Sequence, residues 1–111
     1  MAVIYTDGHM NGLNGVGGFF PNSGYSMVKT DKETFTIPYE KKRLTNNEAE
    51  LLAIFHAITK AYPNDTICSD SRIAIRKATM GNDLLSVVVK YIIDRKKLIL
   101  KWIPREKNPV T

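Results

Sequence analysis

The sequence predicts an α/β fold in which helices flank one mixed β-sheet. Short β-branched and aromatic runs, separated by polar turns, occupy the chain up to residue 41. An amphipathic helical pattern follows from Thr45, and the remainder reads as a short strand, two helices and a last strand. Strands first, and alternating helices and strands afterwards, are typical of a mixed sheet with helices packed on it.

Length and composition predict one small soluble domain over residues 1–111. The 111 residues are 43% hydrophobic and 24% charged, enough to bury a modest core. The net charge of +5 favours a polyanionic partner. The one cysteine, Cys68, lies in an apolar run, which indicates a buried side chain in a reducing compartment. No apolar run reaches the roughly 20 residues of a membrane span and no signal-peptide pattern opens the chain, so we expect a cytoplasmic protein.

The first strands are bounded by turn residues. "AVIYTDG" (2–8) is a strand that runs into an Asp-Gly turn, and a glycine-rich stretch, "GLNGVGGFF", follows it. "YSMVKT" (25–30) and "TFTIPYEK" (34–41) are further extended runs on either side of the polar "DKE". An antiparallel hairpin or meander is therefore expected.

Helix and strand then alternate. A helix is predicted from Thr45 to about Tyr62, followed by the strand "TICSD". Residues 71–80 and 83–97 read as two helices with a break at Gly81-Asn82, although a β-branched run, residues 87–89, leaves the second ambiguous. "LILKWIP" (98–104) reads as the last strand, ended by its proline.

Two glutamates lie near the start of the first helix. Thr45 and Glu48 have the spacing of a capping box, so Glu48 has a structural role. Glu50 lies roughly 200° away around the helix, at the other border of the apolar stripe. Helix geometry alone does not choose between them, but the capping role of Glu48 favours Glu50 as the chemically active one.

Asp7 and Asp70 each end an apolar strand, in "VIYTD" and "TICSD". If these strands are parallel neighbours, their ends lie about 4.8 Å apart and the carboxylates can converge. Such a cluster is stable only with cations, and hard oxygen ligands suit Mg²⁺ or Mn²⁺. The alternative for either aspartate alone is a simple turn residue.

Taken together, these motifs resemble the type 1 ribonuclease H family. They are "YTDG", the glycine-rich "NGVGGF", "TNNEAEL", "CSDS" and "LKWIPREKNP", in an order and spacing that span nearly the whole chain. The resemblance implies a ribonuclease H-like mixed five-stranded sheet, with strands 1–3 antiparallel and strands 4 and 5 parallel to the first.

The resemblance also implies an activity and a site. Asp7, Glu50 and Asp70 would be catalytic and would bind two Mg²⁺ ions, with Mn²⁺ possible, for two-metal hydrolysis of a phosphodiester. Asp7 would bridge the ions, and Glu50 and Asp70 would hold the one at the leaving group. The substrate would be the RNA strand of an RNA/DNA hybrid, recognised by its sugars and shape.

Nucleic-acid contacts are expected at Gly8, Gly12, Thr45, Asn46 and Asn47, which match the family's substrate-binding positions. Asparagine is also common at helix starts, so both asparagines have a simpler explanation. The basic run at residues 41–43 can reach phosphates, although such runs are more often solvated surface.

The C-terminal end departs from the family pattern. A further catalytic aspartate of the family follows an asparagine by four positions; here that asparagine is Asn108, and the aspartate would come directly after Thr111. We therefore expect a C-terminally truncated domain without the last helix, in which hydrolysis suffers more than binding. Alternatives are a non-catalytic nucleic-acid-binding module of the same fold and a resolvase- or transposase-type DNA nuclease.

Three other side chains invite a ligand role. His56 falls on the polar side of its helix and is expected at the surface. Trp102 suggests base stacking, but its place in an apolar strand favours core packing. His9 is expected to be a turn residue without a special role.

Overall fold

The computed structural model describes residues 1–11, 23–40 and 45–111. Within these ranges the strands are β1 (Val3–Asn11), β2 (Ser23–Lys29), β3 (Thr34–Glu40), β4 (Thr66–Ser69) and β5 (Ile99–Trp102). The helices are α1 (Asn46–Lys60), α2 (Arg72–Met80), α3 (Leu84–Lys96) and the short 3₁₀ helix η2 (Arg105–Lys107).

The strands form one mixed sheet in the order β3-β2-β1-β4-β5. β1, β2 and β3 pair antiparallel, whereas β4 is parallel to β1 and β5 is parallel to β4. The predicted five-stranded arrangement is thus confirmed. Tyr5 of β1 pairs with Cys68 of β4. Asp7 and Asp70 each lie two residues beyond that pair, so both lie near the carboxyl end of β4.

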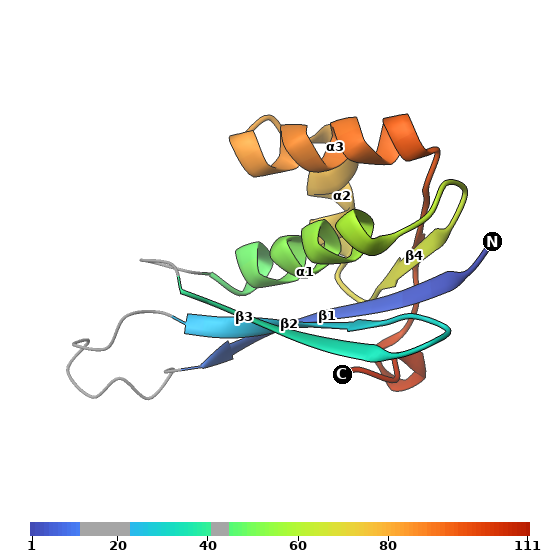
Figure 1. Cartoon of the computed structure of the whole chain (residues 1–111). Coiled ribbons are helices and arrows are strands. Elements are labelled where there is room, and N and C mark those ends of the chain that lie inside the picture. Colours follow the sequence, from blue (N-terminus) through green and yellow to red (C-terminus); the bar gives the residue numbers. More distant parts are fainter. Residues whose placement is uncertain (12–22, 41–44) are drawn as a thin grey trace.

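All three α-helices lie on one side of the sheet, and η2 lies on the other side (Figure 1). The core between sheet and helices is built around α1, where Ala53 and Ala57 are fully buried. Small side chains let this helix approach the strands closely. The large buried core residues are Ile4, Val28, Leu51, Ile54, Ile58, Ile67 and Val89.

Helix α1 ends two residues earlier than predicted, at Lys60. Ala61 is already extended, and the residue before Pro63 is disfavoured in the helical region, so the helix cannot continue through Tyr62. The Lys96 ammonium donates hydrogen bonds to the carbonyls of Ile58 and Ala61, at 2.7 and 2.9 Å, and thereby satisfies acceptors at the helix end.

Helices α2 and α3 agree with the predicted pair and its break at Gly81-Asn82. The β-branched run, residues 87–89, is helical because Asp83 caps the helix and Val89 packs in the core. Cys68 is a free, buried thiol, as predicted. None of the helices in the described part of the chain is both long and apolar enough to cross a membrane.

Two predictions about single side chains are wrong. Trp102 is 38% exposed, because it lies at the end of the edge strand β5 and lines the open groove; its indole lies against Arg72 instead of packing in the core. His56 is half-buried, not at the surface, because the sheet extends beneath its side of α1. Its Nδ1 lies 2.7 Å from Ser26 Oγ on β2.

Candidate metal centre and nucleic-acid groove

Three carboxylates from distant parts of the chain meet near the carboxyl end of β4. Asp7 comes from β1, Glu50 from the first turns of α1, and Asp70 directly follows β4. One oxygen of each lies within 4.8 Å of the others. The structure therefore brings together the three residues that the sequence singled out as candidate metal ligands.

Glu50 is held in this cluster by the backbone of β1. The Gly8 N–H donates to Glu50 Oε1 at 2.6 Å. A Cβ at Gly8 would collide with the Ala49 carbonyl, so only glycine lets the strand approach the helix this closely. Close approach of the backbone thus explains the glycine that follows Asp7.

Glu48 lies outside the cluster and takes part in capping, as predicted. Its backbone N–H donates to Thr45 Oγ1 at 3.1 Å, and that hydroxyl lies 3.3 Å from the Glu48 carboxylate. These contacts satisfy one of the first amide groups of α1. The choice of Glu50 over Glu48 therefore agrees with the geometry.

Asp70 is oriented by the C-terminal segment, which the sequence analysis did not anticipate. Asn108 Nδ2 donates to Asp70 Oδ2 at 3.2 Å and to the Thr6 carbonyl at 2.9 Å. Thr111 Oγ1 donates to the same Asp70 oxygen at 2.7 Å. No pattern in the sequence pairs residues so far apart, although the resemblance had already singled out Asn108 as a motif residue.

Asp7 has a neighbouring histidine. His9 Nε2 lies 3.1 Å from Asp7 Oδ2 and 3.2 Å from the Val110 carbonyl, and its ring stacks on Tyr25 with centroids 4.7 Å apart. The expectation that His9 is a turn residue is therefore wrong: His9 lies within β1, and it contacts one of the clustered carboxylates because residues two apart in a strand point to the same face.

The Asp7 and Glu50 carboxyl groups hold protons more tightly than exposed carboxyl groups do. Burial raises the pKa of Asp7, which is 6% exposed. Burial, followed by a hydrogen bond with Asp7, raises the pKa of Glu50 to about 9. Both shifts mean that negative charge is unfavourable in the cluster unless a cation compensates it. Three converging carboxylate oxygens fit a hard divalent cation such as Mg²⁺ or Mn²⁺.

An open groove of about 580 Å³ borders the cluster. Asn46 and Asn47, exposed at the start of α1, line it together with Glu50 and Asp70. Its remaining walls are formed by Ser71, Arg72, Ile73 and Trp102. The predicted contact residue Gly8 lies beside the cluster; Gly12 and the basic run at residues 41–43 lie outside the described residues.

Tyr39 is a polar residue near the cluster that the sequence analysis missed. Its hydroxyl lies 3.3 Å from the His9 carbonyl, with the geometry of a donated hydrogen bond. Burial, together with the charge of Glu50, raises its pKa to about 12. The sequence shows Tyr39 only as one of two aromatic residues in a strand, so nothing there distinguished it.

Comparisons with known proteins agree with this geometry. The RNase H family model matches residues 1–91. The crystal structure of LC11-RNase H1 in complex with an RNA/DNA hybrid superposes with a TM-score of 0.64 at 20% sequence identity, covering 98% of this chain and 89% of that one. The N-terminal RNase H domain of rv2228c from Mycobacterium tuberculosis, solved as a fusion with maltose-binding protein, gives a TM-score of 0.65 at 19% identity, covering 96% and 84%. The chain belongs to the ribonuclease H family.

Proposed function

We propose that this protein hydrolyses the RNA strand of RNA/DNA hybrids endonucleolytically, with divalent cations held by Asp7, Glu50 and Asp70. The observation that carries the proposal is the convergence of these carboxylates within 4.8 Å beside an open groove. Family membership and the hybrid bound to LC11-RNase H1 support the substrate class.

In this proposal the chain's own residues have separate tasks. Asp7, Glu50 and Asp70 hold the cations, which would supply Lewis-acid stabilisation of negative charge on the phosphodiester. The Gly8 N–H fixes the Glu50 carboxylate, because it donates to Oε1. Asn108 orients Asp70 by its hydrogen bond to Oδ2. Positioning of this kind matters because misplaced ligands lower the rate sharply.

Substrate recognition is assigned to the rim of the groove. The amides of Asn46 and Asn47 offer donors and acceptors suited to 2′-hydroxyl and sugar groups in a minor groove. Thr45, the N-cap residue of α1, is exposed beside them. Contacts of this type read sugar and shape, so we expect little sequence specificity.

The test is cleavage of matched RNA/DNA hybrid, duplex DNA and duplex RNA in the presence of Mg²⁺ or Mn²⁺. The proposal predicts cation-dependent cuts in the RNA strand of the hybrid only. Preferential cleavage of duplex DNA would favour a recombinase-type nuclease instead. Salt-sensitive hybrid binding without cleavage would favour a binding module.

A further inference from the structure

Arg72 and Trp102 form a stacked pair on the wall of the groove. The Arg72 guanidinium carbon lies 3.8 Å from the centre of the Trp102 ring, and both residues line the groove with Asp70 and Glu50. A stacked guanidinium keeps its N–H edge free, and this edge matches the geometry of a phosphate. The pair therefore presents a positive, planar donor beside the carboxylate cluster.

Trp102 is itself fixed to the cluster's backbone. Its Nε1 donates to the Asp70 carbonyl at 3.2 Å. Arg72 is thus linked through the indole to the residue that carries a candidate metal ligand. A side chain held in this way loses less conformational freedom when it binds a ligand than a free arginine does.

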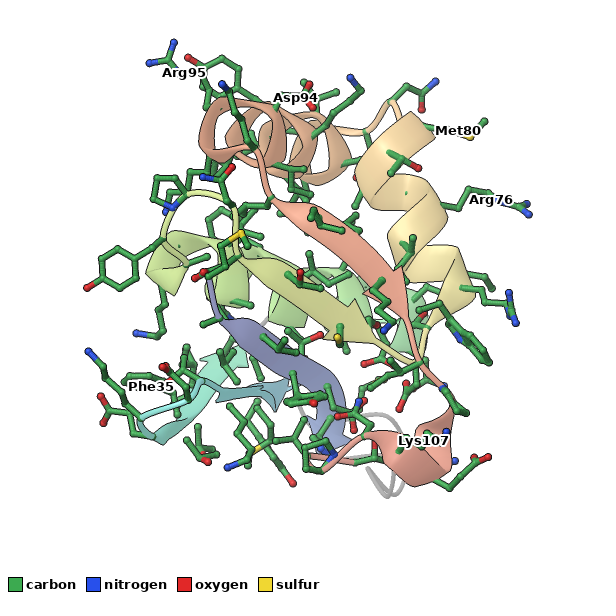
Figure 2. All side chains as sticks on the ribbon, turned by 90° about the vertical axis from the view of Figure 1, so that its right-hand side faces the viewer. Phe35, Arg76, Met80, Asp94, Arg95 and Lys107 are labelled. Atoms are coloured by element: carbon green, nitrogen blue, oxygen red, sulfur yellow. The ribbon has the colours of Figure 1, made fainter. Side chains whose placement is uncertain are left out.

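Arg76 continues the positive edge along α2. It lies four residues after Arg72, on the same helix face and about 6 Å further along the axis. Figure 2 shows Arg76 projecting outward from α2, away from the sheet, and Arg95 at a distant corner of the molecule, on α3. A nucleic-acid strand carries one phosphate per about 3.4 Å of helix axis, so two arginines about 6 Å apart can contact nearby phosphates of one backbone.

Neither arginine is neutralised by a partner in the described part of the chain. The close contacts there between basic and acidic side chains are His9 with Asp7 and Lys90 with Asp94. Arg72 and Arg76 are both exposed. Their charge is therefore available to a polyanion.

We propose that Arg72, held in place by Trp102, and Arg76 bind nearby phosphates of the nucleic-acid strand that leaves the carboxylate cluster along α2. Arg72 and Arg76 contact the substrate, and Trp102 is a positioning residue for Arg72. The proposal rests on the proposed function for its ligand class, but it concerns binding and can be tested without cleavage.

The experiment measures hybrid binding at several salt concentrations without divalent cations. Arg72→Gln and Arg76→Gln should each weaken binding and reduce the slope of log K against log salt by about 1. The matched control is Arg95→Gln, since Arg95 also lies over an aromatic ring, Tyr91 at 5.9 Å, but on α3. This control should bind like the unaltered chain.

The role of Trp102 needs its own readout. Trp102→Leu should weaken binding but keep most of the salt dependence, because Arg72 keeps its charge. Trp102→Phe keeps a ring face for Arg72 to stack on, so it should bind nearly as well as the unaltered chain. In cleavage assays Trp102→Leu should raise KM with little change in kcat. Thermal unfolding of each variant separates these effects from loss of folding.

The outcomes distinguish this proposal from the proposed function. Binding and salt slope unchanged in folded Arg72→Gln and Arg76→Gln would overturn the phosphate contacts, whatever the cleavage result. Equal losses in Trp102→Leu and Trp102→Phe would overturn the positioning role. A chain that binds the hybrid through Arg72 and Arg76 but never cleaves it would overturn the proposed function alone.

Discussion

Two glutamates two residues apart in α1 have different surroundings. Glu48 takes part in the helix cap with Thr45. Glu50 instead accepts a hydrogen bond from the Gly8 N–H and lies in the carboxylate cluster with Asp7 and Asp70. The sequence favoured this division because capping spacing is local and readable from four residues. The partners of Glu50 lie in other strands, so the cluster itself could be inferred only by assuming that β1 and β4 are parallel neighbours.

Glu50→Gln should abolish most cleavage while Glu48→Gln should not. The first change removes a charged candidate ligand, and even the loss of a partner that only orients a metal ligand reduces affinity or activity by about 10–100-fold. The second keeps a side chain that is accepted at the third position of a capping box. Steady-state hybrid cleavage by the two variants checks this; full activity in Glu50→Gln would reject our assignment.

The burial of His56 is not visible in the sequence, because helical periodicity describes only the helix and not the strands that pack on it. Its position on the wheel is polar, yet β2 brings Ser26 within 2.7 Å of its ring. Burial lowers the pKa of His56 from its ordinary 6.5, and the nearby charge of Lys60 adds to this.

The contribution of His56 to the stability of the protein should therefore fall in mild acid, whereas the raised pKa of Glu50 changes stability in the opposite direction over the same range. Because the pKa of His56 is lower in the folded state, the unfolded chain binds a proton on this imidazole more readily. The contribution of neutral His56 to the free energy of unfolding is therefore fully present above pH 6.5. It is lost as the pH falls from 6.5 through the folded-state pKa. Urea unfolding of the unaltered chain and of His56→Asn across this range should show that the stability of the unaltered chain relative to the variant decreases as the pH falls below 6.5; a relative stability that does not change with pH would contradict the explanation.

At the scale of elements, the close contact of β1 with α1 assembles the site. The strands and helices were predictable to within a few residues, since turn residues and helix caps are local signals. Helix α1 ends before the predicted Tyr62, because the residue before Pro63 is disfavoured in the helical region. The exposure of Trp102 depends on which strand ends the sheet, and an apolar run such as "LILKWIP" does not reveal this.

Gly8→Ala tests this contact. The new Cβ would collide with the Ala49 carbonyl, so strand and helix must separate. We expect a loss of about 1–3 kcal/mol in the free energy of unfolding, as for other overpacked sites, together with reduced cleavage. Glu50→Gln is the matched comparison, because it should reduce cleavage while the fold persists. A Gly8→Ala variant as stable as the unaltered chain would contradict the close-approach explanation.

For the whole molecule, the resemblance to the ribonuclease H family predicted a mixed five-stranded sheet with strands 1–3 antiparallel and strands 4 and 5 parallel to the first, and the observed sheet confirms it. The contacts of the C-terminal segment could not be predicted in the same way. Asn108 reaches Asp70 and Thr6 only because the chain returns past β5 to the edge where the carboxylates lie. Such contacts between the C-terminal segment and the carboxylate cluster depend on tertiary packing, which no local sequence pattern reveals.

Divalent cations should stabilise the whole fold. Since the cluster binds cations only when folded, Mg²⁺ at 100 times its Kd should add about 2.7 kcal/mol to the free energy of unfolding. Thermal unfolding with increasing Mg²⁺ should show a rising midpoint in the unaltered chain and a much smaller rise in Asp70→Asn. Equal shifts in both proteins would mean that the cation binds elsewhere.

Cleavage of an RNA/DNA hybrid labelled separately on each strand tests the central claim most directly, with the unaltered chain and Asp7→Asn compared in Mg²⁺ and Mn²⁺. Our account predicts that the unaltered chain produces fragments from the RNA strand alone, only when the cation is present, and that Asp7→Asn produces almost none. Cleavage of the DNA strand, equal cleavage by Asp7→Asn, or an intact RNA strand under all conditions would contradict it.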